Sequence, residues 1–223
     1  MTFSIVARCA RTGQFGMAIS SSSPAVAARC AHVRAGVGAV ASQNITDPAL
    51  GPMVLDQLES GLPAADALAV VTADRPHIDY RQLLVVDREG RTAIHSGRQV
   101  LGIWGEARAT DCAAGGNLLA GELVPMAMVE AFTAAKGHLA ERLMLALEAG
   151  LQAGGEAGPV HSAGLKVADR LDWPLVDLRI DWSDNPIGML REAWTVYAPQ
   201  MAAYVQRAED PTQAPSYGVP GDE

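Results

Sequence analysis

The chain has 223 residues and a mass of 23.4 kDa, the size of one globular domain with at most a short appendage. Hydrophobic residues make up 49% of it and charged residues 19%, so a large core can form and global disorder is excluded. Lys and Arg number 17 against 25 Asp and Glu, a formal net charge of −8, and no basic cluster occurs. Nucleic-acid binders take most of their affinity from Lys and Arg on phosphates, so no nucleic-acid partner is expected.

The cysteine count and the apolar runs indicate the cellular compartment of the protein. Cys9, Cys30 and Cys112 form no CxxC pattern, and their odd number is typical of reduced thiols. No run of about 18 apolar residues occurs, and the first residues lack the basic and apolar regions of a signal peptide. We therefore expect a cytoplasmic protein with no membrane partner.

The chain opens with patterns typical of strands. Thr2–Arg8 and residues 15–20 predict a hairpin, and residues 36–42 predict a buried strand of small residues. This last run, GVGAVAS, also matches the GxGxxA pattern of dinucleotide-binding turns. That pattern requires a helix directly after the glycines, whereas here Ser42-Gln43-Asn44 follows, so a close-packed strand is favoured.

Helices and strands then follow each other along the chain. Asp47 is expected to cap a helix with Pro48 at its first position, and Gly61 to end it. Gly115-Gly116-Asn117 is expected to open a mainly helical half of the chain. The remaining expected elements are helices at Ala64–Thr72, Val124–Ala134, 140–153 and 186–203, and strands at 82–86, 91–95, 100–105, 162–167 and 175–180. This order lacks the strict alternation of a doubly wound sheet and indicates a layered α+β fold with antiparallel sheets.

The end of the chain differs in composition from the body. Pro and Gly dominate residues 207–223 and apolar periodicity is absent there. We expect a single domain over residues 1–206, followed by a disordered tail over residues 207–223.

The last expected helix carries one apolar stripe about four turns long. Two interpretations stay open, because the stripe is either covered by the body of a monomer or forms the interface of a homodimer. The stripe consists of Leu190, Trp194, Tyr197, Met201 and Tyr204.

Common patterns of metal, phosphate and serine-hydrolase sites are missing or incomplete. The five histidines form no HExxH motif and no i,i+4 pair, so structural or surface roles are favoured over a metal site. No GxxxxGK[ST] motif occurs, and Ser162 fails the GxSxG pattern because Val160 replaces its first glycine. Neither a metal nor an organic cofactor is expected.

Thr2 stands out chemically because it directly follows the initiator methionine. Initiator methionine is commonly removed before a residue as small as threonine, and removal of Met1 leaves a free amine beside the Thr2 hydroxyl. That amine can act as general base for the hydroxyl of its own residue, which makes Thr2 a candidate nucleophile. While Met1 stays attached, the Thr2 nitrogen is an amide and cannot act as a base. An ordinary strand end is the alternative.

Several blocks of sequence together resemble one protein family. The blocks are TFSIVAR, TGQFGMAISSSS, GVGAVASQ, the pair Arg81-Gln82, AGGNLLAGELVPMAM, AERLMLALEAGLQAGGE, HSAGLKV and DLRIDWSDNP. In this order, over residues 2–190, they resemble domain-of-unknown-function family 1028. The resemblance implies an N-terminal-nucleophile (Ntn) hydrolase-like fold, a four-layer αββα sandwich of antiparallel sheets, and it leaves the substrate open.

The resemblance also implies where a site lies. Thr2 falls at the nucleophile position of Ntn hydrolases, and Ser20 and Ser21 fall at the end of the second strand, where a polar residue often lies beside it. A plain polar strand end is the alternative for the serines. Further polar positions of the family's blocks are matched by Gln43, Arg81, Gln82, Asn117 and Ser162.

Chemistry suggests roles for some of these residues. Asn117 and Gln43 are candidate donors to an oxyanion, and Arg81 is a candidate bidentate partner of a substrate carboxylate. The alternatives are a turn role for Asn117 and an ion pair of Arg81 with Asp79 or Asp181.

The loop after the long helix departs from the family pattern. A basic residue and a glutamine are usual there, whereas residues 156–161 read EAGPVH, so that His161 stands where the glutamine is usual. His161 and Ser162 are therefore candidate substrate-binding residues.

We expect an Ntn-type amidohydrolase that acts on a small amide, with Thr2 as nucleophile and its own amine as the proton shuttle. The alternative is a non-catalytic small-molecule-binding or assembly protein that retains the fold, because a fold does not by itself confer a function.

Overall fold

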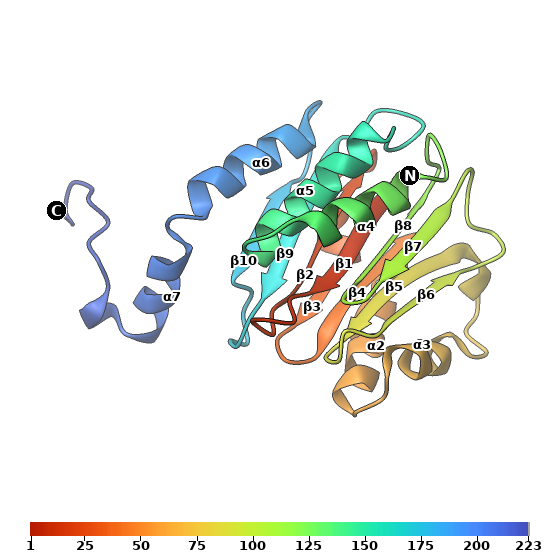
Figure 1. Cartoon of the computed structure of the whole chain (residues 1–223), viewed down its shortest axis with the longest axis horizontal. Helices are drawn as coiled ribbons and strands as arrows, with labels where there is room; N and C mark the ends of the chain where they lie inside the picture. Colours follow the sequence, from red (N-terminus) through yellow and green to blue (C-terminus); the bar gives the residue numbers. More distant parts are fainter. Residues whose placement is uncertain (223) are drawn as a thin grey trace.

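The computed structural model describes residues 1–222, which form two antiparallel β-sheets with helices packed against them (Figure 1). The strands of the six-stranded sheet are, in spatial order, β10 (Val176–Ile180), β9 (Ser162–Ala168), β2 (Phe15–Ser21), β1 (Thr2–Arg8), β8 (Cys112–Asn117) and β7 (Gly105–Ala109). Those of the four-stranded sheet are β3 (Ala31–Arg34), β4 (Gly38–Asn44), β5 (Arg81–Asp87) and β6 (Thr92–Ser96).

Helices lie between and beside the strands in the sequence. They are α1 (Val26–Cys30), α2 (Leu50–Glu59), α3 (Ala64–Thr72), α4 (Val124–Ala134), α5 (Leu139–Gln152), α6 (Pro186–Tyr197) and α7 (Met201–Glu209), with 3-10 turns at Ile78–Tyr80 and Pro211–Gln213. Within residues 1–222, no helix combines the length and the apolar character needed to cross a membrane.

The inner faces of the two sheets meet in a core of aliphatic and small side chains. Met17 and Ile19 of the six-stranded sheet share one buried cluster with Ala39, Ala41 and Leu84 of the four-stranded sheet. Side chains of a strand alternate between its two faces, so Val40, which lies between the two alanines, packs in the cluster of α2 and α3 instead. The alanines on the inner face allow the sheets to approach closely.

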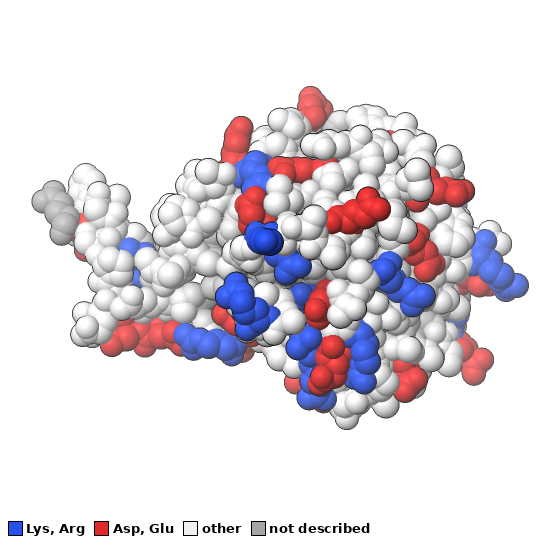
Figure 2. Space-filling view, viewed as in Figure 1, with Lys and Arg blue, Asp and Glu red and all other residues white. Residues whose placement is uncertain are grey.

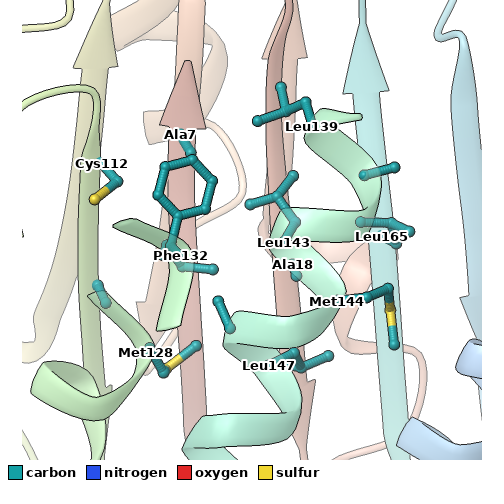
Figure 3. Packing of buried hydrophobic residues seen from close by; sticks show 14 of the residues in the cluster. Ala7, Ala18, Cys112, Met128, Phe132, Leu139, Leu143, Met144, Leu147 and Leu165 are labelled. Atoms are coloured by element: carbon teal, nitrogen blue, oxygen red, sulfur yellow. The ribbon is translucent and has the colours of Figure 1, made fainter. Parts of the chain in front are cut away.

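The outer face of the six-stranded sheet is covered by α4 and α5. Figure 3 shows Phe132 of α4 and Leu143 of α5 above the strands that carry Ala7 and Ala18, and all four belong to one buried cluster. Small strand residues under large helical ones give close packing with few aromatic residues. On the face of the molecule seen in Figure 2, acidic and basic side chains are interspersed.

Several elements expected from the sequence are confirmed. The helices at Ala64–Thr72 and Val124–Ala134 have the expected bounds, and the hairpin of β1 and β2 forms. The helix expected from Pro48 begins at Leu50, because the Asp47 carboxylate accepts a hydrogen bond from the Ala49 N–H in a turn before it.

Two expectations for the middle of the chain are wrong. Residues 100–104 form no strand, and residues 115–117 end β8 rather than opening a helix. Small side chains are required in β8, because a Cβ on Gly116 would lie 2.6 Å from the Leu119 Cδ2 and 3.0 Å from the Thr2 carbonyl oxygen. Glycines that are typical of turns therefore occupy the middle of a sheet.

The C-terminal helical segment is divided. Instead of one helix over residues 186–203, α6 ends at Tyr197 and α7 starts at Met201. Met201 and Val205 of α7 pack against the buried cluster of the body, and the residues after α7 project from it (Figure 1). Leu190 and Trp194 are buried against the body, and Tyr197 and Met201 are partly buried against the same cluster, so the body covers the first half of the apolar stripe and part of the second half. Tyr204 is partly exposed, and a homodimer interface over the second half stays a prediction.

The boundary expected at residue 207 falls inside α7. The Arg207 guanidinium lies 3.7 Å from the centre of the Tyr217 ring, so the segment beyond α7 folds back toward that helix. The last residue of the expected tail, residue 223, lies outside the described residues.

Asp87 joins the β5–β6 turn to the start of α3. Its buried carboxylate accepts hydrogen bonds from the backbone N–H groups of Ala64 (3.0 Å), Glu89 (2.9 Å) and Arg91 (3.0 Å) and from Arg91 Nε (2.7 Å). Burial alone would raise the pKa of Asp87, but the hydrogen bonds from Ala64, Arg91 and Glu89 outweigh it and hold that pKa below its ordinary value.

Replacing Asp87 by Asn is expected to lower the free energy of unfolding by about 2 kcal/mol at pH 7, because the charge-assisted hydrogen bonds are lost. A lowered pKa contributes stability above the unfolded-state value of about 3.9 and loses it as the pH falls, so the deficit should shrink at pH 3. Urea denaturation at both pH values measures it, with exposed Glu89→Gln of the same turn as control. A deficit independent of pH would contradict this assignment.

Truncation at Ala208 is expected to leave the melting temperature within a few degrees. This truncation removes the ion pair of Arg170 with Glu209, whose side chains are 60% and 40% exposed, so the ion pair contributes little to stability. Calorimetry of both chains checks this. A drop of roughly ten degrees would show that the tail is docked on the body or on a second subunit.

Candidate active site

Polar side chains meet where β1 begins between β2 and β8. The register places Thr2 opposite Asn117 of β8, and Phe3 opposite Ser20 of β2. Thr2 is 5% exposed, and Ser20, Ser21 and Asn117 are buried. The first residues of the chain thus lie inside a six-stranded sheet, with hydrogen-bonded neighbours on both sides.

The Thr2 hydroxyl has a second hydroxyl beside it. Thr2 Oγ1 lies 3.4 Å from Ser21 Oγ, and both hydroxyls donate to the carbonyl oxygen of Met1. Two O–H groups therefore converge on one carbonyl oxygen, which is the arrangement needed to hold such an oxygen as it becomes negatively charged, and Thr2 Oγ1 lies beside that carbonyl group.

A network of side-chain amides lies behind this pair and joins the two sheets. Ser4 Oγ donates to Gln43 Oε1 (2.6 Å), and Gln43 Nε2 donates to Gln82 Oε1 (2.8 Å). Gln82 Oε1 also accepts from Asn117 Nδ2 (3.2 Å), and Gln82 Nε2 donates to Ser96 Oγ (3.1 Å). The structure thus brings together three residues expected at the site, Gln43, Gln82 and Asn117, and orients them without any charged group.

Asn117 is the member of this network that faces the start of β1. One hydrogen of its Nδ2 is used by Gln82, and its buried Oδ1 has no hydrogen-bond partner among residues 1–222. A buried polar atom without a partner costs free energy, and such atoms are typical of sites that receive a ligand. Asn117 is a strand residue, so the alternative of a turn residue is wrong.

Ser20 and Ser162 hold the strands beside the site. Ser20 Oγ donates to the Ser162 carbonyl (2.9 Å), and Ser162 Oγ donates to the Ser23 carbonyl (2.6 Å) and accepts from the Val26 N–H (3.2 Å). Ser162 is paired with Ser21 in the β2–β9 register. In this arrangement both hydroxyls bind backbone carbonyls near the site.

Arg81 is directed elsewhere. It is the residue before Gln82 on β5, so its side chain points to the opposite face of the sheet, and it donates to the Ile45 carbonyl. Neither expected ion pair of Arg81 forms among the described residues, since Asp79 pairs with Arg98 and Asp181 with Arg179. The structure does not bring Arg81 together with Thr2.

His161 lies at the rim of the site. Its backbone N–H donates to the Ser21 carbonyl (2.8 Å), and its ring stacks on Trp182 with ring centres 4.5 Å apart. Its Nδ1 lies 3.3 Å from the Ser183 carbonyl oxygen and 3.4 Å from an Asp184 carboxylate oxygen. His161 is thus connected to the site through the backbone of Ser21.

Glu156 was not among the residues expected at the site. It is 4% exposed, and both carboxylate oxygens lie 3.1 Å from the Ser22 nitrogen, one residue beyond Ser21. Burial raises the pKa of the Glu156 carboxyl to about 7, against the opposing effects of the Met1 amine and the Ser22 N–H. The sequence feature that could have marked Glu156 as a site residue is its position as an acidic residue inside the glycine-rich run 154–158. Its relation to the chain terminus appears only in the three-dimensional structure.

A cavity of about 250 Å³ opens next to Glu156. Leu151, Val160 and Ile187 give it apolar walls, and Asp184 adds a second carboxylate. Among residues 1–222, no group of three or more His, Cys, Asp or Glu side chains is arranged to hold a metal ion.

Comparison with known proteins identifies the family. The model of a family of unknown function, DUF1028, matches residues 2–190. The chain belongs to this family. A solved DUF1028 structure, protein SPO2555 from Silicibacter pomeroyi, is 32% identical to it, with a TM-score of 0.86 over 92% of this chain and 90% of that chain. The family resemblance of the sequence blocks is thereby confirmed.

Similarity outside DUF1028 is weak. Anbu, the ancestral beta-subunit from Yersinia bercovieri, is 12% identical, with a TM-score of 0.39 over 91% of this chain and 97% of that chain. A TM-score of this size does not establish a shared fold. A search of curated proteins finds no match.

The amide network of this DUF1028 chain is expected to stabilise the pairing of the sheets. Replacing Gln82 by Met, which has a similar length, leaves the amide hydrogens of Gln43 and Asn117 without their shared acceptor. We expect a loss of about 3 kcal/mol in the free energy of unfolding, measured by urea denaturation. The exposed Gln152→Met exchange on α5 is the control and should change stability by less than about 0.5 kcal/mol. Equal stabilities of the two variants would contradict a structural role of the network.

Proposed function

We propose that this chain is an Ntn-type amidohydrolase that cleaves a small amide after removal of Met1, with Thr2 as nucleophile. The observation that carries the proposal is the convergence of the Thr2 and Ser21 hydroxyls on one carbonyl, at the head of a strand enclosed on both sides. The closed strand keeps the nucleophile in a fixed position, which the attack on an amide requires.

The packing of the elements supports this proposal. The clusters of buried residues follow one another as α4 and α5, the six-stranded sheet, the four-stranded sheet, and α2 and α3. We interpret this order as the four-layer αββα sandwich of Ntn hydrolases. In that fold the nucleophile begins a strand of a central sheet, as Thr2 does here.

The proposed reaction uses the groups of the site in sequence. The free amine of Thr2 accepts the hydroxyl proton, and Oγ1 attacks the carbonyl carbon of the amide. The O–H of Ser21 and the second N–H of Asn117 donate to the tetrahedral oxyanion. The protonated Thr2 amine then returns its proton to the leaving nitrogen, the C–N bond breaks, and water hydrolyses the resulting Thr2 ester.

Gln43 and Gln82 act in this proposal as positioning residues. They hold the Asn117 amide through the shared Gln82 Oε1, so that its free N–H keeps one direction. The proposed reaction requires no metal and no organic cofactor, and we place the enzyme in the cytoplasm.

A non-catalytic binding protein is the second candidate function. It is favoured by the state in which Met1 stays attached, because the Thr2 nitrogen is then an amide and both hydroxyls are occupied by the Met1 carbonyl. The mass of the intact chain from its native host separates the two candidates, since complete retention of Met1 would contradict the hydrolase.

Replacing Thr2 by Ala is expected to lower kcat/KM at least about 1,000-fold, because the attacking hydroxyl is lost while the amine stays. Replacement by Ser keeps a hydroxyl and should retain measurable activity. Both side chains are small enough for Met1 removal, which mass spectrometry verifies in each variant. Release of amine from a panel of chromogenic amides measures the rates, and an Ala variant as active as the Thr2 chain would refute the mechanism.

A further inference from the structure

Met1 fills the space in front of the Thr2 hydroxyl, and each of its groups meets a different part of the site. Its carbonyl oxygen accepts from Thr2 Oγ1 and Ser21 Oγ. Its side chain passes over Gly158, where an added Cβ would lie 3.5 Å from the Met1 Cε and 3.9 Å from the sulfur. The positive charge of its amine opposes the rise in the pKa of the Glu156 carboxyl. Met1 is thus an aminoacyl group held with its carbonyl at the nucleophile.

The carboxylate of Glu156 is held in place by its loop. The Ala157 N–H donates to the Leu118 carbonyl (2.9 Å), and the Ala120 N–H donates to the Gly155 carbonyl (3.0 Å). Glu156 itself forms a β-bridge with Leu119, directly after β8. The loop is therefore attached to the end of the strand that carries Asn117, and the carboxylate cannot easily turn outward.

This buried carboxylate has few partners of its own. The Ser22 N–H is the donor that it binds, and the Met1 amine is the positive charge that acts on it. A buried carboxylate is costly unless a cation pairs with it. Removal of Met1 leaves the Thr2 amine as the new chain terminus, but the proposed mechanism uses that amine as an uncharged base, so the position vacated by the Met1 amine favours a positive charge supplied by the substrate.

We propose that Met1 marks the acyl site of the enzyme, and that Glu156 binds the free α-ammonium group of an aminoacyl amide substrate. The proposal rests on the proposed function, since it places the substrate carbonyl carbon next to Thr2 Oγ1 and the carbonyl oxygen within reach of Ser21 Oγ, in the space that Met1 vacates. The substrate side chain then lies over Gly158 and extends into the cavity with apolar walls from Leu151, Val160 and Ile187. The substrate class is therefore an amide of an α-amino acid with an apolar side chain and an unblocked amine.

The test uses a chain that begins at Thr2, released from an N-terminal fusion by a protease. Its substrates are the 7-amino-4-methylcoumarin amides of methionine and of N-acetylmethionine, which differ in the charge of the amine. We expect kcat/KM for the free amine to be about 30-fold higher, as for a charged hydrogen bond made in the site. Glu156→Gln should reduce this ratio to near one, whereas the exposed Glu130→Gln should keep it.

The remaining outcomes separate this inference from the proposed function. Equal rates with both amides overturn the inference and leave the hydrolase in place. A Glu156→Gln variant that slows both amides equally also overturns it, because Glu156 then acts on the Thr2 amine instead.

If neither amide is hydrolysed, calorimetric titration with methioninamide and N-acetylmethioninamide decides. Binding of the free amine alone, lost in Glu156→Gln, supports the site without the hydrolase. Binding of neither compound overturns the inference.

Discussion

The pairing of β1 on both of its edges is the constraint on which the rest of the site depends. A chain terminus ordinarily frays, but here the backbone of Thr2 lies between Ser21 and Asn117, on strands that are themselves covered by β9 and β7. The sheet therefore gives the first residues of the chain the rigidity of a core strand. Chemistry at this terminus needs no additional loop to position it.

Between the sheets, neutral amides provide the polarity that charged residues would otherwise supply. Gln43 and Gln82 are fully buried, and each makes hydrogen bonds to another side chain and to a backbone carbonyl of β8, that of Gly115 or Gly116. Neutral amides avoid the desolvation cost of buried ions, so the network can lie in an otherwise apolar core. The buried carboxylate of Glu156 does not belong to this network, because it lies at the end of the strands rather than between the sheets.

The sequence predicted those parts of the fold in which a local pattern decides the structure. The helix at Ala64–Thr72 follows from its apolar periodicity, and the strand at Thr2–Arg8 follows from its content of residues that favour strands. The strand β8, CAAGGN, was missed because its small residues are required by neighbours that are distant in sequence. One such neighbour is the Thr2 carbonyl, which leaves no room for a side chain at Gly116. Glu156 was missed for the same reason, since its neighbours are Ser22 and the chain terminus.

The two ends of the chain lie in opposite surroundings. The N-terminus is embedded among β1, β2 and β8, whereas the residues after α7 stand away from the body (Figure 1). An affinity tag fused ahead of Met1 would hold the Thr2 nitrogen in amide form. A tag fused after residue 223 leaves Met1 unchanged. With Met1 removed as proposed, preparations of this protein that differ only in tag position are chemically different molecules at Thr2.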